Sequence, residues 1–177
     1  MKIYFLRHGQ TDWNAQRRIQ GHTNIPLNKT GIEQAKKAKE ELDKIEFDIC
    51  FTSPLDRARQ TAEIVLEGRN IPIELAPEIM ERNFGEFEGT SYDVADKLAL
   101  RAWLTTKLSK GETTAILFKR ISDFLDDLKL NYVDKKSILL VSHGGVARCV
   151  KWYFEGKPEE DGQLIKHPNC AIVCYEA

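Results

Sequence analysis

The sequence predicts an α/β fold, a three-layer αβα sandwich with a mostly parallel central sheet. Three short apolar runs, residues 3–6, 49–51 and 137–142, have the length and composition of buried strands. Amphipathic stretches, in which apolar residues recur every three or four positions, lie between these runs. Strands that alternate with helices in this way form parallel sheets. Because 177 residues can bury a single core, we expect residues 1–177 to form one domain.

The charge of the chain is balanced, with 26 Lys and Arg residues against 27 Asp and Glu residues. A balanced surface offers no overall basic field for nucleic acid or an acidic membrane, so we expect neither as a partner. No apolar stretch approaches the ~18 residues of a membrane span, and the N-terminal apolar run is too short for a signal peptide. We therefore expect a cytoplasmic protein. The oligomeric state is left open.

The four cysteines are Cys50, Cys149, Cys170 and Cys174. They lack the paired spacing of a metal site, and three of them lie in apolar runs. We therefore expect buried, reduced thiols rather than disulfides or metal ligands.

The N-terminal part of the chain carries two helix-start signals after a long loop. Residues 10–27 are polar and without a regular period, and loops of this length in compact domains are commonly functional. A capping box at residues 30–33 predicts a helix that ends near residue 46. Ser53 and Pro54, which follow the second strand, are typical of an N-cap and a first helical residue.

The middle of the chain is less regular. Residues 71–75 alternate between apolar and polar and predict a short edge strand. Residues 78–89 combine carboxylates, aromatics and two glycines, a composition that suits neither a helix nor a strand. We expect a folded loop in which Met80, Phe84 and Phe87 form an apolar frame around one carboxylate.

Helices dominate the C-terminal half. Residues 91–110 predict one or two helices, and residues 111–113 interrupt them before a long amphipathic helix. The strand at residues 137–142 leads into a helix that extends from residue 146 to about residue 155. A last strand is expected at residues 171–175.

Two strands from opposite ends of the chain finish in the same way. The first ends in Arg7, His8 and a glycine, and the strand at residues 137–142 is followed by His143 and a glycine. Because ligands bind beyond the carboxyl ends of parallel strands, these side chains should share one pocket. Arg57 adds a cation in a first helical turn, where the helix dipole favours an anion. This cationic, donor-rich set suits phosphoryl transfer.

Four motifs occur in order along the chain, and together they carry a resemblance. They are Arg7-His8-Gly9-Gln10-Thr11-x2-Asn14, Ser53-Pro54-Leu55-x-Arg57-Ala58-x-Gln60-Thr61, Glu81-x3-Gly85-x2-Glu88-Gly89 and Ser142-His143-Gly144-Gly145. With them the chain resembles the histidine phosphatase superfamily, and the resemblance implies a phosphoglycerate-mutase-like fold.

The resemblance also implies roles for particular residues. His8 would be the nucleophile that forms a phosphohistidine, and Glu81 would be the general acid that protonates the leaving oxygen. No metal ion or other cofactor is implied. A phosphate or sulfate ion would fit the pocket. The implied catalytic residues are His8, Glu81, Arg7, Arg57 and His143, and the candidate phosphate- or substrate-binding residues are Arg7, Asn14, Gln20, Gly21, Arg57, Arg82, His143 and Gly144.

The chemistry of the side chains supports these roles independently. An attacking imidazole must be neutral, and two nearby guanidinium groups should push the pKa of His8 below its usual ~6.5. The arginines would therefore activate the nucleophile as well as bind phosphate. Glu81 must instead be protonated near neutrality, which a bound phosphate dianion and the apolar frame would favour and the arginines would oppose.

Several activities fit such a site. We favour a phosphatase over a phosphoglycerate mutase, because the chain is short for a mutase and Lys97, Arg101 and Lys107 are too dispersed to form its basic cluster. A non-catalytic phosphate-binding module is a third hypothesis. A metal site built from His8, His143 and Glu81 is disfavoured, since it would place two arginines against a cation.

Substrate choice should depend on an insertion at about residues 82–110, which forms either a lid or packed core. The substrate is expected to be a small phosphate ester, and sugar phosphates, nucleotide-derived or ribazole-type phosphates and phosphoserine are all candidates. Asn24 replaces an aspartate that is common in relatives, which we expect the loop to tolerate. His22 and His167 are expected to be loop residues.

Overall fold

The computed structural model describes residues 1–92, 111–157 and 167–177, and its centre is a five-stranded sheet. The strand order is β3-β2-β4-β1-β5, and every neighbouring pair is parallel except β1 and β5. The predicted α/β class with a mostly parallel sheet is therefore confirmed. The strands are β1 (Lys2–Arg7), β2 (Ile49–Thr52), β3 (Ile73–Leu75), β4 (Ser137–Ser142) and β5 (Ile172–Glu176).

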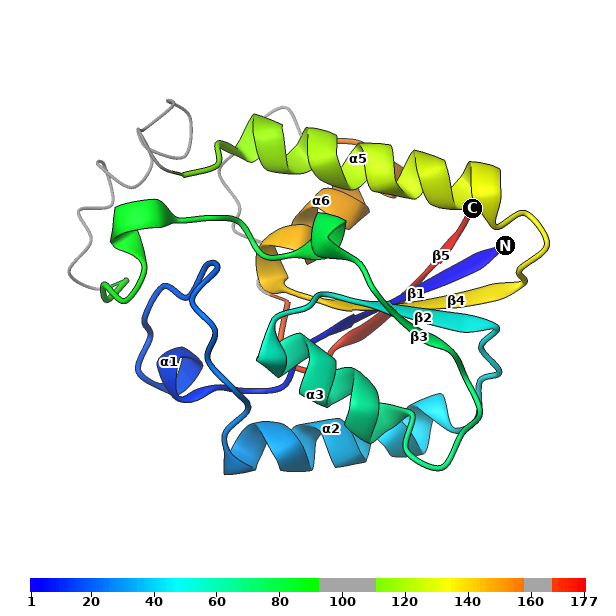
Figure 1. Ribbon diagram of the computed structural model, residues 1–177, viewed down its shortest axis with the longest axis horizontal. Helices are drawn as coiled ribbons and strands as arrows, with labels where there is room; N and C mark the ends of the chain where they lie inside the picture. Colours follow the sequence, from blue (N-terminus) through cyan, green and yellow to red (C-terminus); the bar gives the residue numbers. More distant parts are fainter. Residues whose placement is uncertain (93–110, 158–166) are drawn as a thin grey trace.

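Helices cover both faces of the sheet, as Figure 1 shows: α5 and α6 lie on one side, and α2 and α3 lie on the other. No helix in the described ranges is long and apolar enough to cross a membrane. The helices are α1 (Asp12–Ala15), α2 (Lys29–Leu42), α3 (Asp56–Val65), α5 (Thr114–Asn131) and α6 (Gly144–Glu155), with 3₁₀ turns η1 (Pro77–Ile79) and η2 (Gly85–Phe87).

Two apolar clusters give the sandwich its three layers. Successive residues of a strand point to opposite faces of its sheet, so one buried strand can serve both clusters. In β4, Ile138 and Leu140 pack with the helix pair α5 and α6, whereas Leu139 and Val141 pack with α2 and α3. The apolar face predicted for the long helix is buried as expected, through Leu117, Ile121, Phe124, Leu125 and Leu128.

The predicted helix starts are wrong at two points. The N-cap of α2 is Asn28, whose side chain accepts a hydrogen bond from Gly31 N, and α2 ends at Leu42 rather than near residue 46. Ser53 does not cap α3, because the helix begins only at Asp56.

The first turn of α3 is instead closed by Asn24, which lies in the polar loop at residues 10–27. Asn24 Oδ1 accepts a hydrogen bond from Asp56 N at 2.8 Å, and Asn24 Nδ2 donates to Asp56 Oδ2 at 2.9 Å. An aspartate at position 24 would place two carboxylates together at this point, so an amide suits the site. The same loop also contains the four-residue helix α1, which the sequence pattern did not predict.

The structure confirms the expectations for residues 71–89 and corrects part of the expectation for the cysteines. The edge strand and the irregular loop at residues 78–89 are confirmed, the loop as two 3₁₀ turns. All four cysteines are free, but only Cys50 and Cys149 are buried, and Cys174, in the edge strand β5, is exposed. The helices expected within residues 91–110 fall almost entirely outside the described residues.

Candidate active site

Strand order alone brings the two predicted histidines together. β1 and β4 are parallel neighbours in which Arg7 pairs with Ser142, so the next residue of each strand is a histidine at the same edge of the sheet. The ring centroids of His8 and His143 are 5.1 Å apart. β2 ends on the other side of β4, and the hydroxyl of Ser53 lies 2.8 Å from His143 Nε2.

The ring of His8 is held in one tautomer. Its Nδ1 lies 2.7 Å from the carbonyl oxygen of Gly9. A carbonyl oxygen can only accept a hydrogen bond, so Nδ1 carries the proton and Nε2 keeps its lone pair. The main chain is also fixed, since Asn169 Nδ2 donates to the carbonyl of His8 at 2.9 Å and Gly9 N donates to Thr61 Oγ1 at 3.0 Å. The lone pair needed for nucleophilic attack is therefore on Nε2.

The environment keeps both imidazoles neutral. His8 is 2% exposed and His143 is fully buried. Burial lowers the pKa of His8 well below its usual value, and the charges of Arg57 and Arg7 lower it further. The pKa of His143 is lowered well below its usual value by the same causes in the same order of size, burial and then the charge of Arg57. The sequence argument named the arginines as the cause, whereas the structure makes burial the larger one.

Arg57 is fully buried despite its place in a first helical turn. Its Nη1 donates to the carbonyl of Thr23 at 2.9 Å, and its Nη2 donates to the carbonyl of Gly21 at 2.7 Å. Burial lowers the pKa of Arg57 to about 10, so the group remains a cation at neutral pH. Arg7 donates to the carbonyl of His167, and the buried Nε atoms of both arginines lack a partner among the described residues. These free donors suit an anion.

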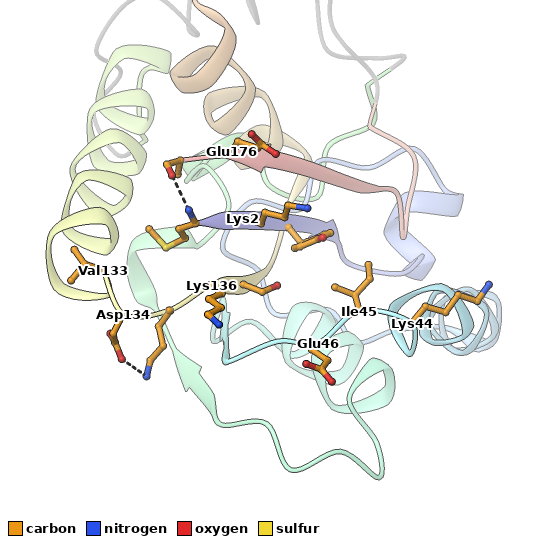
Figure 2. A pocket seen from close by; sticks show the side chains of 13 residues that line it. Lys2, Lys44, Ile45, Glu46, Val133, Asp134, Lys136 and Glu176 are labelled. Atoms are coloured by element: carbon orange, nitrogen blue, oxygen red, sulfur yellow. Dashed lines mark hydrogen bonds and ion pairs between the residues drawn. The ribbon is translucent and has the colours of Figure 1, made fainter.

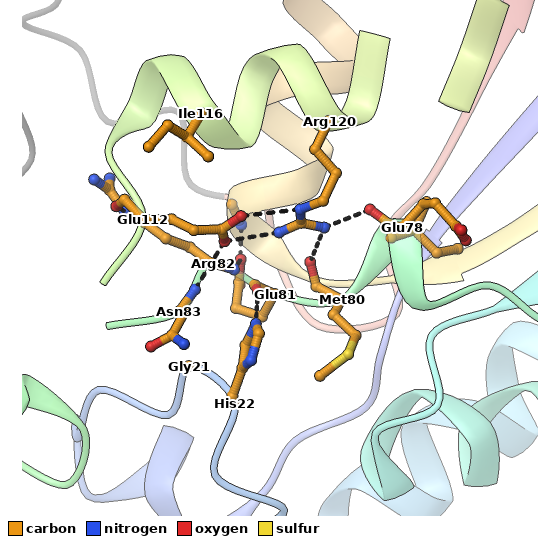
Figure 3. Close-up of polar contacts among 12 residues, drawn as sticks. Gly21, His22, Glu78, Met80, Glu81, Arg82, Asn83, Glu112, Ile116 and Arg120 are labelled. Carbon is orange, nitrogen blue, oxygen red and sulfur yellow. Dashed lines mark hydrogen bonds and ion pairs between the residues drawn. The ribbon is translucent and has the colours of Figure 1, made fainter. Parts of the chain in front are cut away.

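Glu81 lies in the irregular segment that follows η1. Its Oε1 accepts a hydrogen bond from Arg82 N at 2.8 Å, and its Oε2 accepts one from Gly145 N at 3.1 Å. A Cβ atom at position 145 would lie 2.3 Å from Glu81 Oε1, so any larger residue there would displace the carboxylate. The carbonyl of Glu81 lies 2.8 Å from His22 Nε2, which brings this loop histidine into the neighbourhood of the site (Figure 3).

These groups surround a small cavity of about 50 Å³. A larger open hollow, of about 830 Å³, lies at the opposite edge of the sheet beside Lys2 and Lys136 (Figure 2). It contains no histidine, and its lysines lie among carboxylates such as Asp134 and Glu176. The chemistry therefore favours the smaller cavity, which is lined by Arg7, His8, Asn14, Arg18, Gln20, Gly21, Arg57, Glu81, Phe84 and Tyr92.

Comparison with known proteins assigns the family. A family model described as the histidine phosphatase superfamily (branch 1) matches residues 3–177. This chain belongs to the histidine phosphatase superfamily. It is 35% identical over 158 residues to an uncharacterized phosphatase, PhoE, of Bacillus subtilis, a match that covers 89% of this chain and 79% of the relative.

Relatives of this histidine phosphatase superfamily member include both phosphatases and mutases. The chain is 29% identical to a 2,3-bisphosphoglycerate-dependent phosphoglycerate mutase of Staphylococcus epidermidis, over 99% of this chain and 93% of the relative. Among solved structures, an α-ribazole phosphatase from Shigella flexneri matches with a TM-score of 0.80 and 32% identity, over 89% of this chain and 81% of that one. The chain is accordingly a phosphatase or phosphotransferase of this superfamily.

The predicted binding residues of this superfamily member fall into two groups. Asn14, Gln20 and Gly21 line the cavity together with every catalytic candidate except His143, whereas Arg82 and Gly144 do not. The guanidinium of Arg82 is turned toward the N-terminus of α5, where Nε donates to the carbonyl of Glu112 at 2.7 Å. His143 also lies off the wall of the cavity, beside the ring of His8.

Glu88 is a residue of this site that the sequence reasoning did not single out, although it lies inside a quoted motif. Its carboxylate accepts hydrogen bonds from His22 N, Thr23 N, the Thr23 hydroxyl and Phe84 N, at 2.6–3.1 Å. The carbonyls of the same short loop hold Arg57. Glu88 therefore fixes the loop whose carbonyl oxygens position Arg57.

Replacing Glu88 by glutamine should lower the free energy of unfolding by about 2 kcal/mol, because an amide cannot accept all four hydrogen bonds and a bond to a charged group is worth about 1.5–3 kcal/mol. Urea denaturation measures the change. The matched control is Glu86→Gln, which alters an exposed carboxylate in η2, two residues before Glu88, and should leave the midpoint within error. Equal midpoints for the two variants would contradict this role for Glu88.

Proposed function

We propose that this protein is a phosphomonoester hydrolase that acts on a small phosphorylated metabolite through a phosphohistidine on His8 and needs no metal ion. The observation that supports it most is the hydrogen bond from His8 Nδ1 to the Gly9 carbonyl. This bond leaves a neutral, buried Nε2 at the wall of a cavity that also contains Arg7 and Arg57. A nucleophile between two cations suits a phosphate ester.

The proposed reaction has two steps. In the first, His8 Nε2 attacks phosphorus, the bond to the leaving oxygen breaks, and the Glu81 carboxyl group donates a proton to that oxygen. In the second, a water molecule attacks the phosphohistidine and gives a proton to the Glu81 carboxylate, and the P–N bond breaks to release inorganic phosphate. Arg7 and Arg57 neutralise the charge that spreads over the phosphoryl oxygens in both steps.

The proposal includes the setting of the reaction. The partner is a small phosphate ester rather than nucleic acid or a membrane, and the protein acts in the cytoplasm. Ribazole-type phosphates are among the candidate substrates, since the Shigella structure is named for that activity. The proposed specificity insertion at residues 82–110 is described only as far as residue 92.

A phosphoglycerate mutase is the second candidate, and the Staphylococcus relative favours it. The two functions differ in the acceptor of the phosphoryl group, which is water in a hydrolase and a second hydroxyl group in a mutase. A hydrolase releases inorganic phosphate without a bisphosphoglycerate primer. A mutase isomerises phosphoglycerate and depends on that primer.

The deciding experiment is a panel of phosphate monoesters assayed for inorganic phosphate with and without a chelator, and with and without 2,3-bisphosphoglycerate. We expect release that neither addition changes, and an acid-labile, alkali-stable phosphoryl group on His8 after rapid quenching. Activity that vanishes with the chelator, or isomerisation without phosphate release, would overturn the proposal.

A further inference from the structure

An ion pair outside the cavity is more enclosed than the other ion pairs of the described residues. Arg120 of α5 donates from Nε to Glu112 Oε1 at 2.9 Å and from Nη2 to Glu112 Oε2 at 2.8 Å, as Figure 3 shows. The two side chains are 22% and 17% exposed. Two parallel hydrogen bonds between a guanidinium and a carboxylate fix direction as well as distance. We call Glu112 and Arg120 the α5 clamp.

The α5 clamp holds the chain on both sides of Glu81. Before Glu81, Arg120 Nη1 donates to the carbonyls of Glu78 and Met80, the latter at 3.1 Å. After Glu81, Glu112 Oε2 accepts a hydrogen bond from Asn83 N at 3.0 Å, and Glu112 N donates to the carbonyl of Asn83 at 2.9 Å.

The clamp carboxylate is ionised at neutral pH. Burial would raise the pKa of Glu112, but the hydrogen bonds from Arg120 and Asn83 outweigh burial, and the pKa is lowered. Arg120 also projects from a helix that is anchored in the core, since α5 packs there through Leu117, Ile121 and Leu125. By contrast, residues 80–84 belong to no helix or strand. The placement of this irregular segment therefore depends on the helix beside it.

We propose that Glu112 and Arg120 are positioning residues for proton donation, because they hold the segment that carries the Glu81 carboxyl group at the distance from the cavity that leaving-group protonation requires. The inference rests on the proposed function of Glu81. General acid catalysis contributes about 10²- to 10⁴-fold, and displacements near 1 Å can cost on the order of 10²-fold. A purely structural clamp would instead affect all substrates alike.

The test compares two esters whose leaving groups differ in how much they need an acid, and it measures the effect of each substitution on each ester. Cleavage of 4-nitrophenyl phosphate releases 4-nitrophenolate, which is stable without a proton. Cleavage of an alkyl phosphate needs a proton on the leaving oxygen. We expect Arg120→Met to lower kcat/KM by about 10- to 100-fold for the alkyl ester and by less than about threefold for the nitrophenyl ester. The matched control is Lys119→Met, which removes the exposed ion pair with Asp123 on the same helix and should change neither value.

Three further measurements make the outcome decisive. In a Glu81→Gln background, Arg120→Met should cause no further loss on the alkyl ester, since the group that it positions is gone. If Arg120→Met does not fold, Glu112→Gln, which keeps the shape of the side chain, must show the same selective loss. Equal losses on both esters, or no loss on either, would overturn the inference. Wild-type protein that hydrolyses neither ester and forms no phosphohistidine would instead refute the proposed function.

Discussion

Replacing His8 by asparagine is expected to reduce phosphate-ester turnover by about 10⁴-fold or more, because the variant has no nitrogen lone pair to attack phosphorus. Asparagine is the informative substitution, since its amide N–H can still donate to the Gly9 carbonyl that receives His8 Nδ1. The backbone around position 8 is also held by Asn169 and Thr61, which the substitution leaves in place. Steady-state phosphate release, followed for both the nitrophenyl and the alkyl ester, measures the loss.

The control for this variant is its affinity for inorganic phosphate. Arg7 and Arg57 remain and line the same cavity, so the variant should still bind phosphate within about tenfold of the wild-type affinity. Titration calorimetry measures this directly. Turnover within tenfold of wild type would show that another group is the nucleophile.

Much of the fold could be predicted because each buried strand is a short run of apolar residues that is easy to recognise in the sequence. Residues 138–141 and 49–51 are covered on both faces, so they must be apolar throughout and stand out as short runs. Such a run does not indicate whether the strand is parallel or antiparallel to its neighbour. β5 has a strand composition like that of β1, but it runs antiparallel to β1, and nothing in its residues specifies that orientation.

Helix starts were harder to predict because capping is a competition between local and distant partners. Ser53 and Pro54 have the composition of a helix start, yet the serine hydroxyl lies against His143 and the helix begins three residues after Ser53. The cap comes from Asn24, which is 32 residues away in the sequence. A local rule cannot detect such a partner.

In the candidate site, too, the features that follow from local sequence could be predicted, and those that depend on distant residues could not. His8 and His143 could be paired from their common position at strand ends, since parallel strands align their carboxyl ends. The complete burial of Arg57 could not be predicted, because a helical arginine is solvated unless a distant loop supplies carbonyls. Glu88 was missed for the same reason, as its four donors come from residues 22, 23 and 84.

Lowering the pH from 7 to 5.5 is expected to reduce the free energy of unfolding by about 2.5 kcal/mol through His8 and His143, if each has an unfolded-state pKa near 6.5. Both imidazoles stay neutral in the folded protein because burial, followed by the charge of Arg57, lowers their pKa values well below 6.5. In the unfolded chain they take up protons as the pH falls through 6.5. The unfolded state then binds more protons, so stability is lost below pH 6.5 and is unaffected by these groups above it.

Urea denaturation in phosphate-free buffer at intervals between pH 5.5 and 8 measures this dependence in a range where carboxylates of ordinary pKa hardly titrate. His8→Asn and His143→Asn should each remove about half of the slope, and the double variant should remove most of it. A smaller part should remain, because burial and Arg7 also lower the pKa of His167. If the variants follow curves parallel to wild type, each imidazole takes up protons in the folded protein as it does in the unfolded chain. That result would contradict the argument that burial and Arg57 lower the pKa values of His8 and His143 in the folded protein.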